Sequence, residues 1–229
     1  MNFKKQIIVL FLLNSLFEGQ VAAQTVLPAT TVEATTEPTH LRKIPAAYKT
    51  EILAAYAHFP ELKDVPVSFR LRKSACTLKT KPSFFSMFRS KEHRSYVIII
   101  SNKTAKAIEP ISLNKLPEEA RIGVLGHELS HVADFSTKSF AQSARCLIGH
   151  LSPTYLDRFE FHTDELCIRH GLGKELEAWS AYVRQTMHTA NWRGSKYAKK
   201  GESTTERYMN PETIETYIKH EAGNNTVSQ

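Results

Sequence analysis

Closely spaced cysteine pairs are absent from this 229-residue sequence, which has only Cys76, Cys146 and Cys167. Without a Cys-x-x-Cys pair, a zinc finger of the cysteine type has no ligand set. The sequence also lacks an internal repeat, a phosphate-binding glycine loop and a Ser-His-Asp signature. These absences argue against repeat scaffolds, P-loop nucleotide binding and serine hydrolase chemistry.

Apolar runs long enough to span a membrane are also missing after the N-terminus. Residues 7–17 are apolar with few interruptions, follow two lysines, and precede small residues at 21–23. This order predicts a signal peptide over residues 1–23, cleaved after Ala23, with an uncleaved anchor as the alternative. We therefore expect an exported protein, periplasmic or secreted.

The rest of the chain divides into a linker and one domain. Residues 24–42 are rich in threonine, proline and glutamate, contain little to bury, and are predicted to be disordered. Residues 43–229 are long enough for a single core. A helix is expected to end near Pro60, and strands are expected at 65–72, 76–80 and 95–101. With the helices that follow, the pattern predicts an α+β fold with a small sheet of about three strands.

His127 and His131 stand four residues apart in the sequence His-Glu-Leu-Ser-His. On a helix both imidazoles would lie on one face and could bind one tetrahedral metal ion. Glu128 would be the general base for a water that the metal activates. A helix is favoured because Pro117 precedes two glutamates and apolar residues recur at three- and four-residue steps. The pattern predicts a zinc hydrolase; the alternative is a helix with two ordinary polar histidines.

A catalytic zinc ion needs a third protein ligand, and residues 158–168 supply one. Glu160 and Asp164 are four apart and would share a face of a second helix. Glu160 is predicted to bind the metal, and Asp164 to orient a zinc-binding histidine through its far nitrogen. An acidic edge on a surface helix is the alternative, although apolar neighbours indicate burial, where unpaired carboxylates are costly. His150 and His162 are rival third ligands.

The segments HELSH and FEFHTDELCIRHGLG together resemble the gluzincin peptidases, most closely soluble exported relatives of the HtpX and CAAX-prenyl endopeptidase family. Members of that family carry a glutamate ligand and, four residues later, an aspartate, on a helix that often ends at a glycine. Glu160, Asp164 and Gly171 stand at those positions. The resemblance covers residues 117–173. Thr163 departs from the alanine that the family usually has before the aspartate, and the family's internal membrane spans are absent.

The resemblance implies a zincin-like fold and a zinc-dependent endopeptidase that holds one Zn²⁺ per chain through His127, His131 and Glu160. It also implies an extended polypeptide substrate bound along a sheet edge formed by the strand before the metal helix. Two other functions stay open: a zinc hydrolase of a non-peptide envelope amide, and a catalytically silent zinc-containing binding module. The residue that would stabilise the oxyanion is equally open, with His188, Tyr208 and His220 as candidates.

The cysteines leave a further choice open. In an oxidising compartment two of the three would pair. A bridge between Cys146 and Cys167 would flank the predicted ligand helix, and Cys76 is an equally good partner.

Basic residues outnumber acidic ones, 30 to 23, giving a formal net charge of +7. This charge favours acidic partners such as membrane surfaces and cell-envelope polymers. Residues 83–91 mix large apolar and basic side chains and would be a substrate flap, a membrane-touching tip or a cap on the sheet. Residues 192–200 are interpreted as a solvated loop, so no nucleic-acid partner is expected. The sequence does not indicate an oligomeric state.

Overall fold

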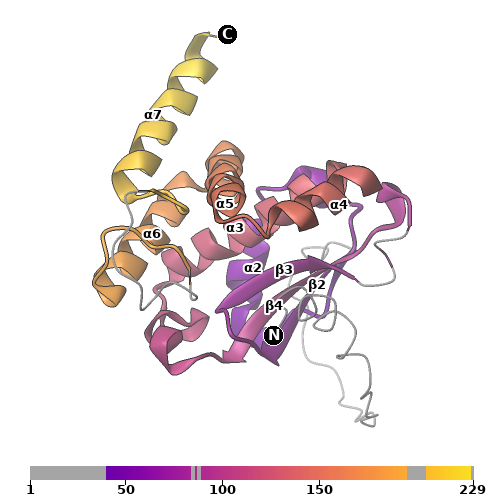
Figure 1. The fold of residues 1–229 in the computed structure, drawn as a ribbon, viewed down its shortest axis with the longest axis horizontal. Helices are drawn as coiled ribbons and strands as arrows, with labels where there is room; N and C mark the ends of the chain where they lie inside the picture. Colours follow the sequence, from indigo (N-terminus) through magenta and orange to yellow (C-terminus); the bar gives the residue numbers. More distant parts are fainter. Residues whose placement is uncertain (1–39, 84–85, 87–88, 195–204, 228–229) are drawn as a thin grey trace, which may run out of the picture. The chain divides into compact units, whose positions relative to one another are not determined.

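The computed structural model describes residues 40–83, 86, 89–194 and 205–227. These residues form a small mixed sheet and a set of helices (Figure 1), which is the predicted α+β class. The predicted signal peptide and nearly all of the predicted linker lie outside the described residues. So do residues 84–85 and 87–88 of the apolar-basic stretch 83–91 that would form a flap, tip or cap. In the described part of the chain, every helix is too short or too polar to cross a lipid bilayer.

In the described residue ranges the sheet has four strands in the order β1-β2-β4-β3, one more than predicted. The first three in this order are parallel, and β3 pairs antiparallel with β4. The strands are β1 (Leu41–Arg42), β2 (Val67–Lys73), β3 (Leu78–Pro82) and β4 (Tyr96–Lys103). β1 occupies the end of the predicted linker, where Leu41 pairs with Val67 and is buried. Two residues are too few for a strand pattern to show in a sequence.

The edge of the sheet beside the metal helix is β3, not β4. β4 precedes that helix but has β2 on one side and β3 on the other, so the prediction that it forms the edge is wrong. The physical reason lies in its composition, Tyr-Val-Ile-Ile-Ile, because the most apolar strand gains most from a central position with pairs on both sides.

One face of the sheet packs on helices (Figure 1), with α2 behind the strands in this view and α3 alongside β3. α2 (Lys49–Tyr56), preceded by the 3-10 turn η1 (Ala46–Tyr48), is the predicted N-terminal helix, and it packs against α3 (Glu118–Thr137). Alternate strand residues such as Phe69 and Ile98 are fully buried in this core. Each such side chain contributes roughly 1.5–3 kcal/mol of burial free energy.

Four more helices follow α3: α4 (Phe140–Gly149), α5 (Pro153–Cys167), α6 (Gly173–Met187) and α7 (Pro211–Val227). α4 was not among the predicted elements. Its start is fixed by a capping box, in which Ser139 and Gln142 each accept a hydrogen bond from the other's main-chain N–H. Short helical segments connect the rest: η2 (Pro60–Leu62), η4 (Lys91–His93), η5 (Lys106–Ile111), η6 (Leu113–Lys115) and the π-type η7 (Ile168–Leu172).

Glycines set how α5 and α6 approach α3. A Cβ on Gly123 would lie 2.0 Å from the carbonyl oxygen of Glu175, so α6 packs against α3 at a distance that only glycine permits. Gly171 has φ 80°, a left-handed conformation that lets the chain turn from α5 into α6. Both helices are therefore held close to the histidines of α3.

Cys146 and Cys167, one of the pairings that the sequence left open, are not joined by a disulfide. Cys146 lies in α4 and Cys167 ends α5, and both are buried thiols that are not bonded to each other. Cys167 instead packs against α3, with its Sγ 3.9 Å from the carbonyl oxygen of Gly123. Sγ of Cys146 lies 3.8 Å from Nδ1 of His150, so the two cysteines face different neighbours.

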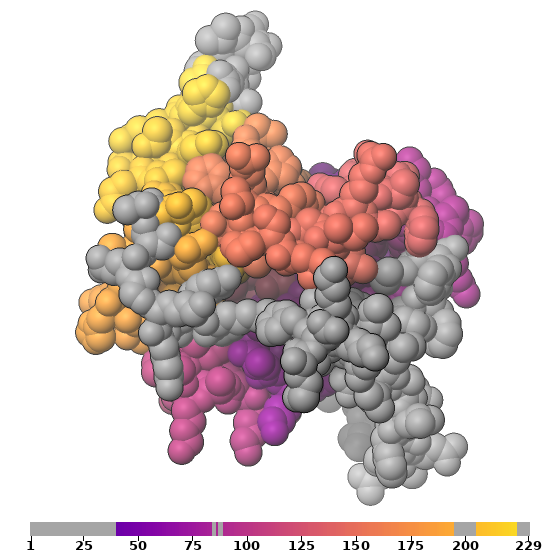
Figure 2. Space-filling view, viewed as in Figure 1, coloured from indigo at the N-terminus to yellow at the C-terminus, as the bar shows by residue number. Residues whose placement is uncertain are grey.

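α4 presents an apolar face to solvent. Phe140, Leu147 and Ile148 are 54%, 46% and 68% exposed, and Leu151 just beyond the helix is 62% exposed. In the space-filling view this helix lies at the surface beside α5 (Figure 2). Clustered exposed apolar side chains of this kind are typical of interaction surfaces.

Candidate metal centre

His127 and His131 of α3 meet Glu160 of α5 in a buried position. Oε2 of Glu160 lies 3.2 Å from Nε2 of His127 and 3.3 Å from Nε2 of His131. One ligand atom from each of the three residues lies within 4.8 Å of the others, which is a group that could hold a metal ion. The structure thus brings together the three residues that the sequence predicted as ligands.

The hydrogen bonding of the three residues fits a bound cation. Oε2 of Glu160 is buried and accepts no hydrogen bond, although two imidazole nitrogens lie nearby. A buried carboxylate oxygen without a partner is costly. Nitrogen lone pairs and a carboxylate oxygen that converge on one point are the donor set that a divalent cation binds. A metal ion at that point would satisfy all three atoms.

Asp164 contacts the far nitrogen of the His127 ring. Its Oδ1 lies 2.7 Å from Nδ1 of His127. An ionised carboxylate only accepts hydrogen bonds, so Nδ1 carries the proton and Nε2 faces Glu160. The other oxygen of Asp164 accepts a hydrogen bond from the main-chain N–H of Met209, at 2.8 Å. Asp164 therefore connects the metal centre to the segment that precedes α7.

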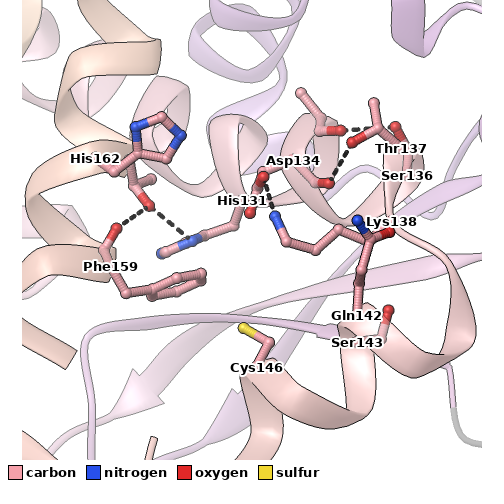
Figure 3. Close-up of polar contacts among 12 residues, drawn as sticks. His131, Asp134, Ser136, Thr137, Lys138, Gln142, Ser143, Cys146, Phe159 and His162 are labelled. Carbon is pink, nitrogen blue, oxygen red and sulfur yellow. Dashed lines mark hydrogen bonds and ion pairs between the residues drawn. The ribbon is translucent and has the colours of Figure 1, made fainter. Parts of the chain in front are cut away.

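Thr163 does for His131 what Asp164 does for His127. Its Oγ1 lies 3.2 Å from Nδ1 of His131 and 2.9 Å from the carbonyl oxygen of Phe159. The hydroxyl has one proton, which it donates to the carbonyl, so its oxygen accepts from Nδ1–H of His131. Figure 3 shows these two contacts reaching His131 and Phe159. The sequence showed Thr163 only as a departure from a family pattern and gave no sign of this contact.

His127 and Glu160 shift each other's pKa in opposite directions. Burial alone would lower the pKa of His127, but its hydrogen bond to Asp164 and the nearby carboxylate of Glu160 outweigh this and raise the pKa to about 10. Burial would raise the pKa of Glu160, yet the neighbouring imidazoles of His131 and His127 hold that pKa well below its usual range. Without a metal ion, a protonated His127 and an ionised Glu160 therefore neutralise each other at neutral pH.

The side chain of Glu128 extends from α3 to β3, the edge strand. Oγ1 of Thr80, on β3, is 2.6 Å from Oε2 of Glu128 and 3.1 Å from its main-chain oxygen. The single hydroxyl proton goes to the carboxylate, since that contact is shorter and the acceptor is charged. The glutamate after the first histidine is thus fixed against the strand at the free edge of the sheet. No sequence pattern pointed to Thr80.

Of the three oxyanion candidates, the structure brings Tyr208 to the centre. Its ring lies 5.6 Å from the ring of His127 and 5.6 Å from that of Trp179. Burial, followed by the charges of nearby carboxylates including Glu160, raises the pKa of Tyr208 well above 10, so the phenol keeps its proton and is a donor. His188 at the end of α6 and His220 on α7 are exposed side chains.

The segment that carries Tyr208 is tied to α5 on both sides of that residue. Before it, Nε of Arg207 donates to Oδ1 of Asp157 at 2.7 Å, and Nη2 of Arg193 donates to Oδ2 of Asp157 at 2.5 Å. After it, Met209 is bound by Asp164. Asp157 is a buried carboxylate that the sequence did not single out, because its partners lie 36 and 50 residues away.

The rival ligands lie apart from the group. Nδ1 of His150 is 2.7 Å from the main-chain oxygen of Cys146, one turn earlier in α4. Nδ1 of His162 lies 3.1 Å from Oε2 of Glu165, and half of the His162 side chain is exposed. Figure 3 shows the His162 ring turned away from His131. Neither His150 nor His162 belongs to the set of converging ligand atoms.

No protein-family model, no curated protein and no solved structure matches this chain. The interpretation of the centre therefore depends on its own geometry.

Proposed function

We propose that the protein is a zinc-dependent endopeptidase with a zincin-like fold and a metal centre of the gluzincin type. The observation that carries this proposal is the convergence of His127, His131 and Glu160 on one point, with Glu128 beside them at the edge of a sheet. Two imidazoles and one carboxylate are a ligand set typical of catalytic zinc, and they leave one coordination position open. Export to the periplasm or beyond belongs to the same proposal.

The residues of the chain have distinct tasks in peptide hydrolysis. A zinc ion, when bound, would polarise the scissile carbonyl and lower the pKa of a water molecule. Glu128, held by Thr80, accepts a proton as the water oxygen bonds to the carbonyl carbon. When the C–N bond breaks, Glu128 gives that proton to the leaving nitrogen. Tyr208 donates a hydrogen bond to the oxygen on which negative charge develops.

Two surfaces of the protein indicate which partners it would bind. An extended polypeptide would add to the free edge of β3, beside Glu128. The exposed apolar face of α4 would make a peripheral contact with a membrane or the cell envelope.

The test is Glu128→Gln, with Glu119→Gln as the matched control on an exposed position of the same helix. Glu128→Gln should abolish cleavage of casein while zinc, measured by elemental analysis, stays at one per chain. Glu119→Gln should cleave like the wild type. Cleavage of casein by Glu128→Gln would contradict the proposal. A zinc-loaded wild type that cuts envelope amides but no protein would indicate a different hydrolase.

A further inference from the structure

The four strands contain arginine and lysine but no aspartate or glutamate. Side chains alternate between the two faces of a strand, so Lys79 and Lys81 of β3 point away from Thr80 and from α3. The register pairs Lys79 with Ile99 of β4, and Ile99 in turn with Arg70 of β2. The face of the sheet opposite the metal centre therefore carries a group of cations that includes Arg70, Arg72, Lys79 and Lys81.

These cations are close enough to repel one another. Burial, and then the charges of Lys79, Arg72 and Arg70, lower the pKa of Lys81. Within the described ranges, none of the four forms an ion pair with a carboxylate. Lys79 is exposed and Lys81 is half-buried, so both can meet a partner that approaches the edge of the sheet. The face is complementary to negative charge.

Among the described residues, no strand pairs with the outer edge of β3. The bonds from Ser101 N–H to Thr77 and from Ser83 N–H to Ser95 show that odd-numbered residues of β3 direct their main-chain groups toward β4. The N–H and C=O groups of Leu78 and Thr80 therefore point away from the sheet. No main-chain hydrogen bond among the described residues uses them.

A polypeptide that adds to this edge would present its side chains alternately to two environments. One set would lie on the face of Thr80, toward Glu128 and the metal ligands. The other set would lie opposite Lys79 and Lys81, with Cβ atoms roughly 5 Å apart. Opposite charges in such cross-strand positions stabilise the pair, and like charges destabilise it.

We infer that the enzyme selects polypeptides with acidic side chains at alternate positions, and that Lys79 and Lys81 determine this preference. The inference depends on the proposed peptidase function and names its class of substrate.

In the experiment, the zinc-loaded full chain is incubated with a library of random decapeptides, and the cleavage products are identified by mass spectrometry. Aspartate and glutamate should be enriched at two positions separated by one residue. In matched peptides, Glu at these positions should give a kcat/KM about fivefold above Gln, and Lys should fall below Gln. The double variant Lys79→Glu/Lys81→Glu should reverse this order, so that Lys is preferred.

The control is Lys63→Glu/Lys174→Glu, which makes the same change of charge at exposed positions outside the sheet and should keep the acidic preference. If the reversed variant does not fold, Lys79→Gln/Lys81→Gln should remove the preference without reversing it. Cleavage with no acidic enrichment, or enrichment that survives in both Lys79/Lys81 variants, would overturn the inference and leave the peptidase standing. Absence of cleavage by zinc-loaded wild type would overturn both.

Discussion

Oγ1 of Thr163 lies 3.2 Å from Nδ1 of His131, next to the residue whose carboxylate holds His127. Two consecutive side chains of α5 thus orient the two histidines of α3. A hydrogen bond at Nδ1 fixes the tautomer that leaves Nε2 free for a metal ion, and such contacts tune metal affinity.

Replacing Thr163 by valine should weaken zinc binding about tenfold, because the ring of His131 loses its partner while the volume of the side chain is conserved. Thr163→Ser keeps the hydroxyl and should bind zinc nearly as tightly as the wild type. Competition with a fluorescent chelator measures both affinities. An equal loss in the serine and valine variants would show that packing, and not the hydrogen bond, is what matters at this position.

Tyr208→Phe should reduce kcat about a hundredfold with little change in KM, because a phenol that donates to the developing oxyanion acts in the transition state. Zinc content should stay at one per chain, since Tyr208 is not among the converging ligand atoms. His188→Ala and His220→Ala, at exposed positions, serve as controls and should keep wild-type kcat. A small decrease in kcat for Tyr208→Phe, together with a large decrease for either control, would show that Tyr208 does not stabilise the oxyanion.

Metal binding should release about one proton from His127 at pH 7.5. The pKa of this histidine is raised to about 10, so the metal-free protein holds the proton at every pH below that value and the metal must displace it. A histidine with the ordinary pKa of about 6.5 would release roughly a tenth of a proton at this pH. Zinc affinity should accordingly fall as the pH decreases from 10 toward 6.5. Calorimetric titration in two buffers of different ionisation enthalpy counts the protons, and a value near zero would contradict the coupling to Asp164 and Glu160.

The elements whose residues follow a local periodic pattern were predictable from the sequence. α3 follows from a 3.6-residue apolar pattern, and α5 from the four-residue spacing of its two carboxylates. The sheet class followed from apolar runs, but its order did not, because nothing in the sequence of β4 says which strand will flank it. The position of β4 is a relation between segments distant along the chain, whereas β1 was missed because it has only two residues.

Several contacts around the metal centre could not be predicted from the sequence for the same reason. Thr80 reaches Glu128 across 48 residues, and Asp164 reaches Met209 across 45. Such contacts depend on how helices and strands pack, which no short pattern encodes. Asp164 could be predicted because it stands four residues after Glu160 on one helix, a spacing that implied its contact with His127. Its contact with Met209 could not be predicted in this way.

Asp157→Asn should destabilise the protein by about 3 kcal/mol, since it leaves the guanidinium groups of Arg193 and Arg207 without the buried carboxylate that neutralises them. Burial opposes ionisation of Asp157, but hydrogen bonds from Arg193 and Arg207 prevail and lower its pKa. A carboxyl group whose pKa is lower in the folded state stabilises the fold above its unfolded value of about 3.9 and loses that contribution as the pH falls through the folded value. The stability difference between wild type and Asp157→Asn, measured by urea unfolding, should therefore be largest at neutral pH and shrink below pH 4. The exposed Asp64→Asn should show no such difference. Because Arg207 precedes Tyr208, Asp157→Asn should also lower kcat; full activity with reduced stability would mean that Asp164 alone positions the tyrosine.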